Sequence, residues 1–116
     1  MGTYNVIFFE KADGSRPAYD FIVSLDKKMA SKVFWTLDVL KHQGPDMRLP
    51  YSKHLGDGIF EIRTKVASDI TRVLYFFVSG KNIVMTNGFV KKTQKTPKNE
   101  IDTAKKYRDE YLSQQT

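Results

Sequence analysis

The sequence predicts an α+β domain in which a helical hairpin packs on a twisted, mostly antiparallel sheet. Three observations lead to this prediction. Several short runs are rich in β-branched and aromatic residues, as strands are. Two adjacent stretches near the N-terminus and one near the C-terminus repeat apolar residues at helical spacing. Glycine and proline signals separate these segments. The expected order is β-α-α-β-β-β-α, and the length of 116 residues predicts one domain, residues 1–116.

The N-terminal half is expected to contain one strand and two helices. YNVIFF at residues 4–9 has the composition of a buried strand. Pro17 suits the first turn of a helix over residues 17–25, and Asp26 is a good N-cap for a second helix over residues 26–43. The apolar stripe of the second helix consists of Met29, Val33, Leu37 and Leu40.

The C-terminal half is expected to contain three strands and a helix. Pro50 and the Gly56-Asp57-Gly58 run predict an irregular segment over residues 46–58. Thr96 and Pro97 have the residue types of an N-cap and a first helical position. The expected strands cover residues 59–65, 71–78 and 83–90, and the helix covers residues 97–112. Alternation in the first of these strands places Glu61, Arg63 and Lys65 on an exposed face.

The composition narrows the possible partners. The formal net charge is +6, which favours a nucleic acid or an acidic protein as the partner. The chain has no cysteine and two histidines, so disulfides, thiolate metal sites and a histidine-rich zinc site are not expected. No stretch has the character of a signal peptide or of a membrane span, so we expect a cytoplasmic protein without a membrane partner.

The stretch between the last strand and the last helix concentrates positive charge. Lys91, Lys92, Lys95 and Lys98 lie there without an acidic residue to balance them. Cations near a helix N-terminus favour phosphate contact or stabilisation of transition-state charge. The alternative is a solvated lysine loop, which composition by itself favours over a phosphate site.

Five further residues have side chains that could carry chemistry. Arg63 and Arg72 can each clamp a phosphate, or instead pair with Glu61 or Asp69. His54, next to Lys53, has a side chain that can move protons near neutral pH, although a surface histidine is the commoner situation. Tyr51 could stack on a base.

Three segments of the chain together resemble a known family. They are DGIFEIR at residues 57–63, RVLYFF at residues 72–77, and NGFVKKTQKTPKNEIDTAKKY at residues 87–107. This pattern resembles the HigB-like toxins of the RelE/ParE superfamily, including the phage-derived HigB-like group. GFVKKTQKTP followed by an E-I-x-x-A helix is the most specific part, and the resemblance extends over nearly the whole chain.

The resemblance implies a RelE-like fold and the toxin of a type II toxin–antitoxin pair. Such a toxin enters the A site of the 70S ribosome and cleaves mRNA without metal or cofactor, by attack of a 2′-hydroxyl on the adjacent phosphate. Matching positions imply catalytic roles for Lys53, Arg63, Arg72, Lys91 and Lys92, with His54 as a further catalytic candidate. Tyr51, Lys95 and Lys98 are the expected RNA contacts.

Two questions stay open on the sequence. Several relatives carry a histidine or tyrosine where this chain has Asn87-Gly88-Phe89, so Lys53, His54 and Lys95 are all candidates for the general base. The resemblance implies a HigA-like helix-turn-helix antitoxin as partner. The alternatives are a non-catalytic nucleic-acid-binding module and a gyrase-directed ParE-like toxin, the latter less consistent with the density of lysine and arginine.

Overall fold

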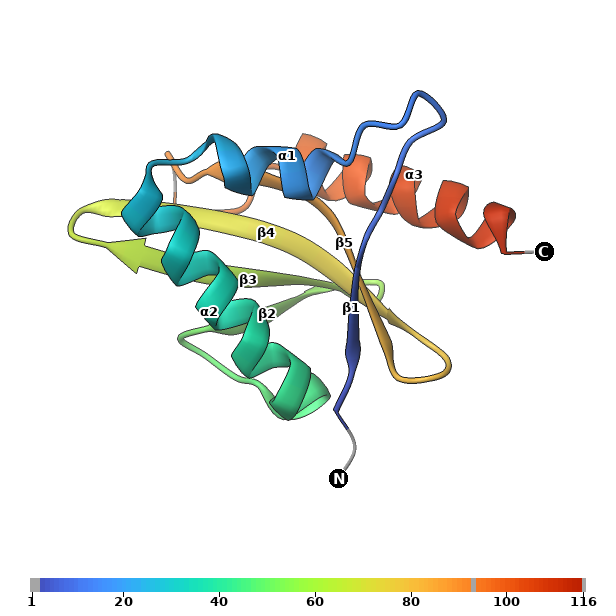
Figure 1. Cartoon of the computed structure of the whole chain (residues 1–116), viewed down its shortest axis with the longest axis horizontal. Helices are drawn as coiled ribbons and strands as arrows, with labels where there is room; N and C mark the ends of the chain where they lie inside the picture. The colour runs from blue at the N-terminus through green and yellow to red at the C-terminus, as the bar shows by residue number, and fades with distance from the viewer. Residues whose placement is uncertain (1–2, 93, 116) are drawn as a thin grey trace.

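A computed structural model describes residues 3–92 and 94–115 and gives the α+β architecture that the sequence predicts (Figure 1). In these residues one five-stranded sheet is combined with three α-helices and a short 3-10 helix. The elements are β1 (Asn5–Phe8), α1 (Pro17–Ser24), α2 (Lys27–Gln43), η1 (Gly44–Asp46), β2 (Ser52–Gly56), β3 (Ile59–Val66), β4 (Asp69–Val78), β5 (Asn82–Val90) and α3 (Lys98–Gln114). No helix in the described ranges is both long and apolar enough to span a bilayer.

The predicted order of elements was wrong in one place, because it lacked β2. Ser52–Gly56 pairs antiparallel with β3, so the order is β-α-α-β-β-β-β-α. The glycine-rich run that suggested an irregular segment forms the hairpin turn between β2 and β3. Asp57 and Gly58 have φ values of 53° and 79°. Positive φ at both central residues is what a tight two-residue hairpin turn requires.

The strand order is β1-β5-β4-β3-β2, and the sheet is mostly antiparallel as predicted. Only the β1–β5 pair among these neighbours is parallel. β3 extends beyond the start of β2, where Tyr51 accepts the Arg63 N–H at 2.8 Å. Past that point the Lys32 ammonium donates to the Lys65 carbonyl at 2.6 Å, so a helix side chain satisfies part of the open strand edge.

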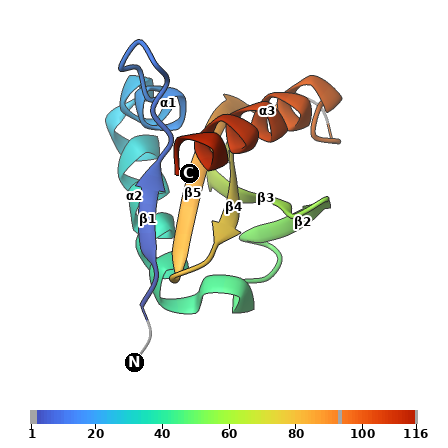
Figure 2. The same ribbon diagram turned by 90° about the vertical axis from the view of Figure 1, so that its right-hand side faces the viewer.

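Helices cover both faces of the sheet (Figure 2). On one face α1 and α2 pack their buried side chains, including Ile22, Val33 and Leu40, against β3, β4 and β5. On the other face α3 packs around Ala104, and Tyr107 stacks on Phe9 with ring centroids 4.9 Å apart. Because successive side chains of a strand point to opposite faces, β3 and β4 place Glu61, Arg63 and Arg72 on the α3 side.

The starts of the two long helices differ from each other. Asp26 caps α2 as predicted, accepting the Met29 N–H at 3.0 Å. The expectation that Thr96 caps α3 was wrong. Pro97 is the N-cap residue, and its carbonyl accepts the N–H groups of Glu100 and Ile101. The Thr96 hydroxyl donates to the buried Glu61 carboxylate, because a charged oxygen is a stronger acceptor than a neutral one.

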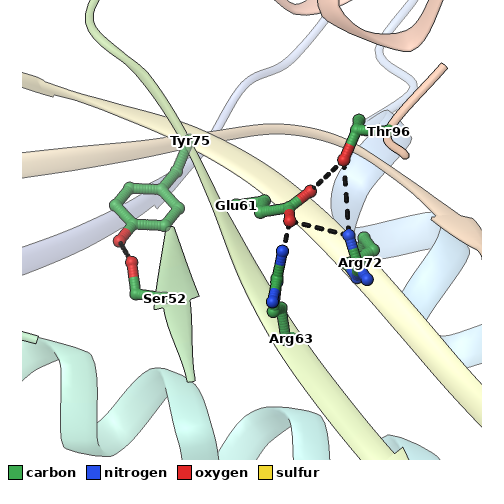
Figure 3. A network of polar contacts seen from close by, with 6 residues as sticks. All are labelled: Ser52, Glu61, Arg63, Arg72, Tyr75 and Thr96. Carbon is green, nitrogen blue, oxygen red and sulfur yellow. Dashed lines mark hydrogen bonds and ion pairs between the residues drawn. The ribbon is translucent and has the colours of Figure 1, made fainter. Parts of the chain in front are cut away.

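A tyrosine is buried between α2 and the sheet. The Tyr75 side chain is 1% exposed, and its hydroxyl lies 2.5 Å from the Ser52 hydroxyl (Figure 3). Burial raises the pKa of Tyr75 from 10.0 to about 12, and the Ser52 hydrogen bond opposes part of this shift. The neutral form is therefore the one that fits the folded state.

We expect the Tyr75 shift to make the protein less stable in alkali. Below pH 10 Tyr75 is neutral in both the folded and unfolded chain, so its contribution is fully present. As the pH rises from 10 to about 12, the unfolded chain ionises first and the free energy of unfolding falls, by roughly 2 kcal/mol across the window. Urea unfolding at several pH values measures this. In Tyr75→Phe the free energy of unfolding should fall less steeply between pH 10 and about 12. An equally steep fall in the two proteins would contradict the expectation.

Gly88 allows α1 to approach β5 closely. A Cβ at this position would lie 2.4 Å from the Phe21 ring and 3.2 Å from the Arg72 carbonyl. Its φ is not in the left-handed region, so the absence of a side chain matters here for space alone. The sheet position that faces α1 therefore needs glycine for packing.

We predict that Gly88→Ala lowers the free energy of unfolding by about 1–3 kcal/mol, because the added methyl group overpacks the contact with Phe21. Chemical denaturation measures the loss. Phe21→Leu combined with Gly88→Ala should cost less than the sum of the two single substitutions, because the smaller side chain makes room. Strict additivity would show that the clash is not with Phe21.

Candidate functional site

The centre of the candidate site is a buried carboxylate that binds three side chains (Figure 3). Glu61 of β3 has no exposed surface. Its Oε2 accepts from Arg63 Nε at 2.9 Å and from Arg72 Nη1 at 2.7 Å. Its Oε1 accepts from Thr96 Oγ1 at 2.5 Å. Glu61 therefore connects two strands to the segment that leads into α3.

This network requires a correction to the predicted exposed face of β3. Glu61 is fully buried because the residues before α3 fold over it, with Thr96 in direct contact. Arg63 and Arg72 face each other across β3 and β4, where two like charges would repel. Glu61 offsets that repulsion and leaves the trio with one net positive charge. The sequence left open whether Arg63 and Arg72 pair with an acidic residue, and in the structure both of them pair with Glu61.

One cavity lies beside Arg72, near the open edge of β3. Its volume is about 310 Å³. Three of the predicted residues besides Arg72 line it, namely Tyr51, Arg63 and Lys91. The backbone N–H of Lys91 donates to the Ile70 carbonyl at 2.8 Å, which fixes the start of the basic segment to the start of β4. This first cavity is thus formed by α2, the segment before β2, β3, β4 and the residue after β5.

A second cavity lies on the other side of Arg63. Its volume is about 180 Å³, and it is lined by Lys53, His54, Leu55, Arg63, Gln94, Lys95, Thr96 and Ile101. Arg63 lines both cavities and its side chain is 26% exposed. The structure therefore places seven of the nine predicted site residues around two cavities that meet at one arginine.

The other two predicted residues lie outside these cavities. Lys92 is exposed and lines neither of them. Lys98 forms an ion pair with Asp102 at 2.9 Å on the outer surface of α3, where both side chains are largely exposed. Exposed ion pairs of this kind contribute little to stability, so this pair holds the Lys98 side chain only weakly.

His54 is held by its neighbours in the β2–β3 hairpin. The Gly58 N–H donates to His54 Nε2 at 3.2 Å, and the ring lies against Phe60 with centroids 4.6 Å apart. An accepting Nε2 places the proton of the neutral ring on Nδ1. In this arrangement Nε2 is occupied by the Gly58 N–H and is not open to a ligand.

The segment Asn87-Gly88-Phe89 has a structural explanation. Asn87 is 5% exposed, and its Nδ2 donates to the Glu100 carbonyl at 3.2 Å and to Glu100 Oε1 at 3.0 Å. Thr86 donates in turn to Asn87 Oδ1 at 2.7 Å. Asn87 therefore fixes the first turn of α3 to β5, and Gly88 accommodates Phe21 on the opposite face.

Sequence reasoning missed six polar residues that line the cavities: Lys32, Thr36, Thr64 and Lys65 in the first, and Gln94 and Thr96 in the second. The strand alternation that identified Arg63 also indicates Lys65. Lys32 has no comparable signal, because the packing of α2 across the edge of β3 brings it there. Among residues 3–92 and 94–115, no group of three His, Cys, Asp or Glu side chains is placed to hold a metal ion.

The fold and the two cavities define a small basic α+β protein whose sheet is compatible with a RelE-like fold. Residues 20–109 match the family described as "Phage derived protein Gp49-like (DUF891)", and the chain belongs to this family. It is a family of RelE/HigB-type toxins, which implies an antitoxin partner in general. A search of curated proteins found no match to the chain.

We predict that Arg72→Ala destabilises the protein more than Arg63→Ala. Arg72 is 3% exposed and donates to both Glu61 and Thr96, whereas Arg63 is 26% exposed. Removing one partner of a buried ion pair costs about 3–5 kcal/mol, and the more exposed arginine should cost about 1 kcal/mol. Urea unfolding of both variants measures the difference.

A double variant provides the control. Arg72→Leu combined with Glu61→Leu removes both buried charges and should be less destabilising than Arg72→Ala alone. Equal losses for Arg63→Ala and Arg72→Ala would contradict the central role that burial gives to Arg72.

Proposed function

We propose that this protein is the toxin of a type II toxin–antitoxin system and acts as a ribosome-dependent mRNA endonuclease. The observation that carries the proposal is the meeting of two cation-lined cavities at Arg63. Membership of a RelE/HigB-type toxin family supports the toxin class. The proposed partners are a HigA-like helix-turn-helix antitoxin, the A site of the 70S ribosome and the mRNA bound there.

The proposed reaction needs charge stabilisation and two proton transfers. The 2′-oxygen of one nucleotide attacks the neighbouring phosphorus, and the bond from phosphorus to the 5′-oxygen breaks. A base takes the proton of the 2′-hydroxyl, and an acid gives a proton to the departing 5′-oxygen. The products carry a 2′,3′-cyclic phosphate and a 5′-hydroxyl. Protein cations stabilise the charge that develops on the phosphoryl oxygens.

We assign charge stabilisation to the first cavity and proton transfer to the second. Arg63 lines both cavities, with Lys91 in the first and Lys53 in the second, so we place the reacting phosphate beside Arg63. The Glu61 carboxylate holds Arg63 and Arg72 in fixed orientations, which reduces reorganisation when charge develops. Lys53 is the proposed base, because His54 Nε2 is occupied by the Gly58 N–H.

One observation favours a second function. Two of the arginines already have an acidic partner in Glu61, and a non-catalytic nucleic-acid-binding module needs only the remaining surface charge. Such a module would bind RNA with a steep dependence on salt and leave the strand intact. The presence or absence of cleavage products separates the two functions.

We expect Arg63→Gln and Lys91→Ala each to lower cleavage about 10²-fold or more, because each removes a cation from the cavity that holds the phosphate. Purified protein is incubated with 70S ribosomes programmed with a defined mRNA, and primer extension maps the ends. Lys106→Ala, on the exposed surface of α3, is the matched control and should cleave like the unaltered protein.

A single 2′-deoxynucleotide at the mapped position tests the chemistry separately, because it removes the attacking hydroxyl and should abolish cleavage there. Unbroken mRNA with salt-sensitive binding would instead select the binding module. Full activity of Arg63→Gln and Lys91→Ala would place the reaction outside these cavities.

A further inference from the structure

A third cavity lies on the α2 side of the sheet. It is bordered by the segment that follows α2 and by the edge strand β2, and its volume is about 310 Å³. Met47 and Phe60, which line it, belong to the core that α1 and α2 form with the sheet. It has no lining residue in common with the first cavity, and it shares only Lys53 and His54 with the second.

Strand alternation separates the third cavity from the second. Ser52 and Lys53 are neighbours in β2, so their side chains point to opposite faces of the sheet. Lys53 lies opposite Glu61, whose side chain is on the α3 side, and Ser52 therefore lies on the α2 side. The third cavity thus has its own polar side chains, apart from the network around Glu61.

The walls of the third cavity are mostly apolar. Pro45, Met47, Leu49 and Phe60 line it, and Leu49 is 61% exposed. No acidic residue is among its described lining residues. Ligand pockets in proteins are predominantly apolar with a few placed polar groups, and this volume is at the small end of their range. The cavity therefore suits a compact ligand with an apolar body.

Ser52 supplies a buried donor at this cavity. Its side chain is 3% exposed, and its Oγ lies 2.5 Å from the Tyr75 hydroxyl (Figure 3). One hydrogen bond between two hydroxyl groups uses only one of their two protons. The phenol is the more acidic group and so the better donor, which leaves the Ser52 proton free. Among the described residues neither hydroxyl has a second partner, and Ser52 is the one of the two that lines the cavity.

Arg48 supplies a cation beside this donor. Its backbone carbonyl accepts the N–H groups of Tyr51 at 3.0 Å and Ser52 at 3.1 Å, so a tight turn holds Arg48 next to Ser52. Its exposed guanidinium group forms no ion pair in the described part of the chain. A guanidinium group matches the planar, two-oxygen geometry of a carboxylate. Buried donors are normally paired, so the free Ser52 proton calls for an acceptor of the same kind.

We propose that the third cavity binds a small apolar carboxylic acid. The carboxylate accepts from Ser52 Oγ and from the Arg48 guanidinium group. The apolar body of the ligand covers Met47, Leu49 and Phe60. Because none of these five residues lines the first or the second cavity, the site is independent of the proposed cleavage of RNA.

The test is a titration of the full chain with phenylacetate, 2-phenylethanol and acetate. Two-dimensional NMR follows the methyl groups of Met47 and Leu49 and the Ser52 backbone N–H, and calorimetry gives the dissociation constants. We expect phenylacetate to shift these resonances saturably, with a dissociation constant of about 1 mM or tighter. The alcohol lacks the charge and acetate lacks the ring, so each should bind about tenfold more weakly.

Two pairs of exposed substitutions provide matched controls. Arg48→Gln should weaken phenylacetate binding about tenfold, whereas Lys28→Gln, on the exposed surface of α2, should change it by less than about twofold. Leu49→Ala should weaken binding about threefold, and Val23→Ala, which shortens a 50% exposed side chain of α1, should not. None of these variants removes a buried side chain, so loss of fold does not confuse the result.

Any of four results would overturn the inference. Phenylacetate leaves the Met47, Leu49 and Ser52 resonances unchanged, or it shifts the Arg63 Nε–H instead, which would place the acid in the cation-lined cavities. The alcohol binds as tightly as the acid, which would show that the carboxylate has no partner in the site. Arg48→Gln and Lys28→Gln bind phenylacetate equally well, which would reduce the contact to non-specific attraction by the net positive charge.

Discussion

The interaction on which the site depends is the bonding of one buried carboxylate to two arginines and a threonine. Without Glu61, Arg63 and Arg72 would bring two positive charges together across neighbouring strands, in a place where Arg72 has almost no access to water. With Glu61, the three side chains together carry one net positive charge. The two hydrogen bonds to Glu61 also fix the orientation of both guanidinium groups. Burial of this charge cluster is tolerable because each ionised group has a charged hydrogen-bond partner.

The same carboxylate positions the basic segment of the chain. Thr96 donates to Glu61, while Asn87 bonds to Glu100 in the first turn of α3. The chain between β5 and α3 is therefore attached to the sheet from both sides. This attachment brings Lys91 to one cavity and Lys95 to the other, with Arg63 between them. A lysine-rich stretch that composition favours as a solvated loop is thereby anchored at the boundary of two cavities.

The sequence predicts the elements of this fold better than their contacts. Periodicity gave both helices of the hairpin, the buried stripe of α2 and the strands β3, β4 and β5, because these signals are local. β2 was missed because Asp57-Gly58 was interpreted as a break, although positive φ at both residues makes it a hairpin turn. The burial of Glu61 and the position of Lys32 could not be predicted, since both depend on segments far away in sequence.

Helices on both faces of the sheet leave few strand side chains open to solvent. α1 and α2 cover one face, and α3 covers the other only from Lys98 onward. Arg63 and Arg72 lie at the end of the sheet where that cover begins, so they are supported by a buried network yet border a cavity. Arg72 contributes mainly rigidity, because nearly all of its surface is buried. Arg63 keeps about a quarter of its side chain exposed and borders both cavities, so it combines a fixed orientation with an exposed guanidinium group.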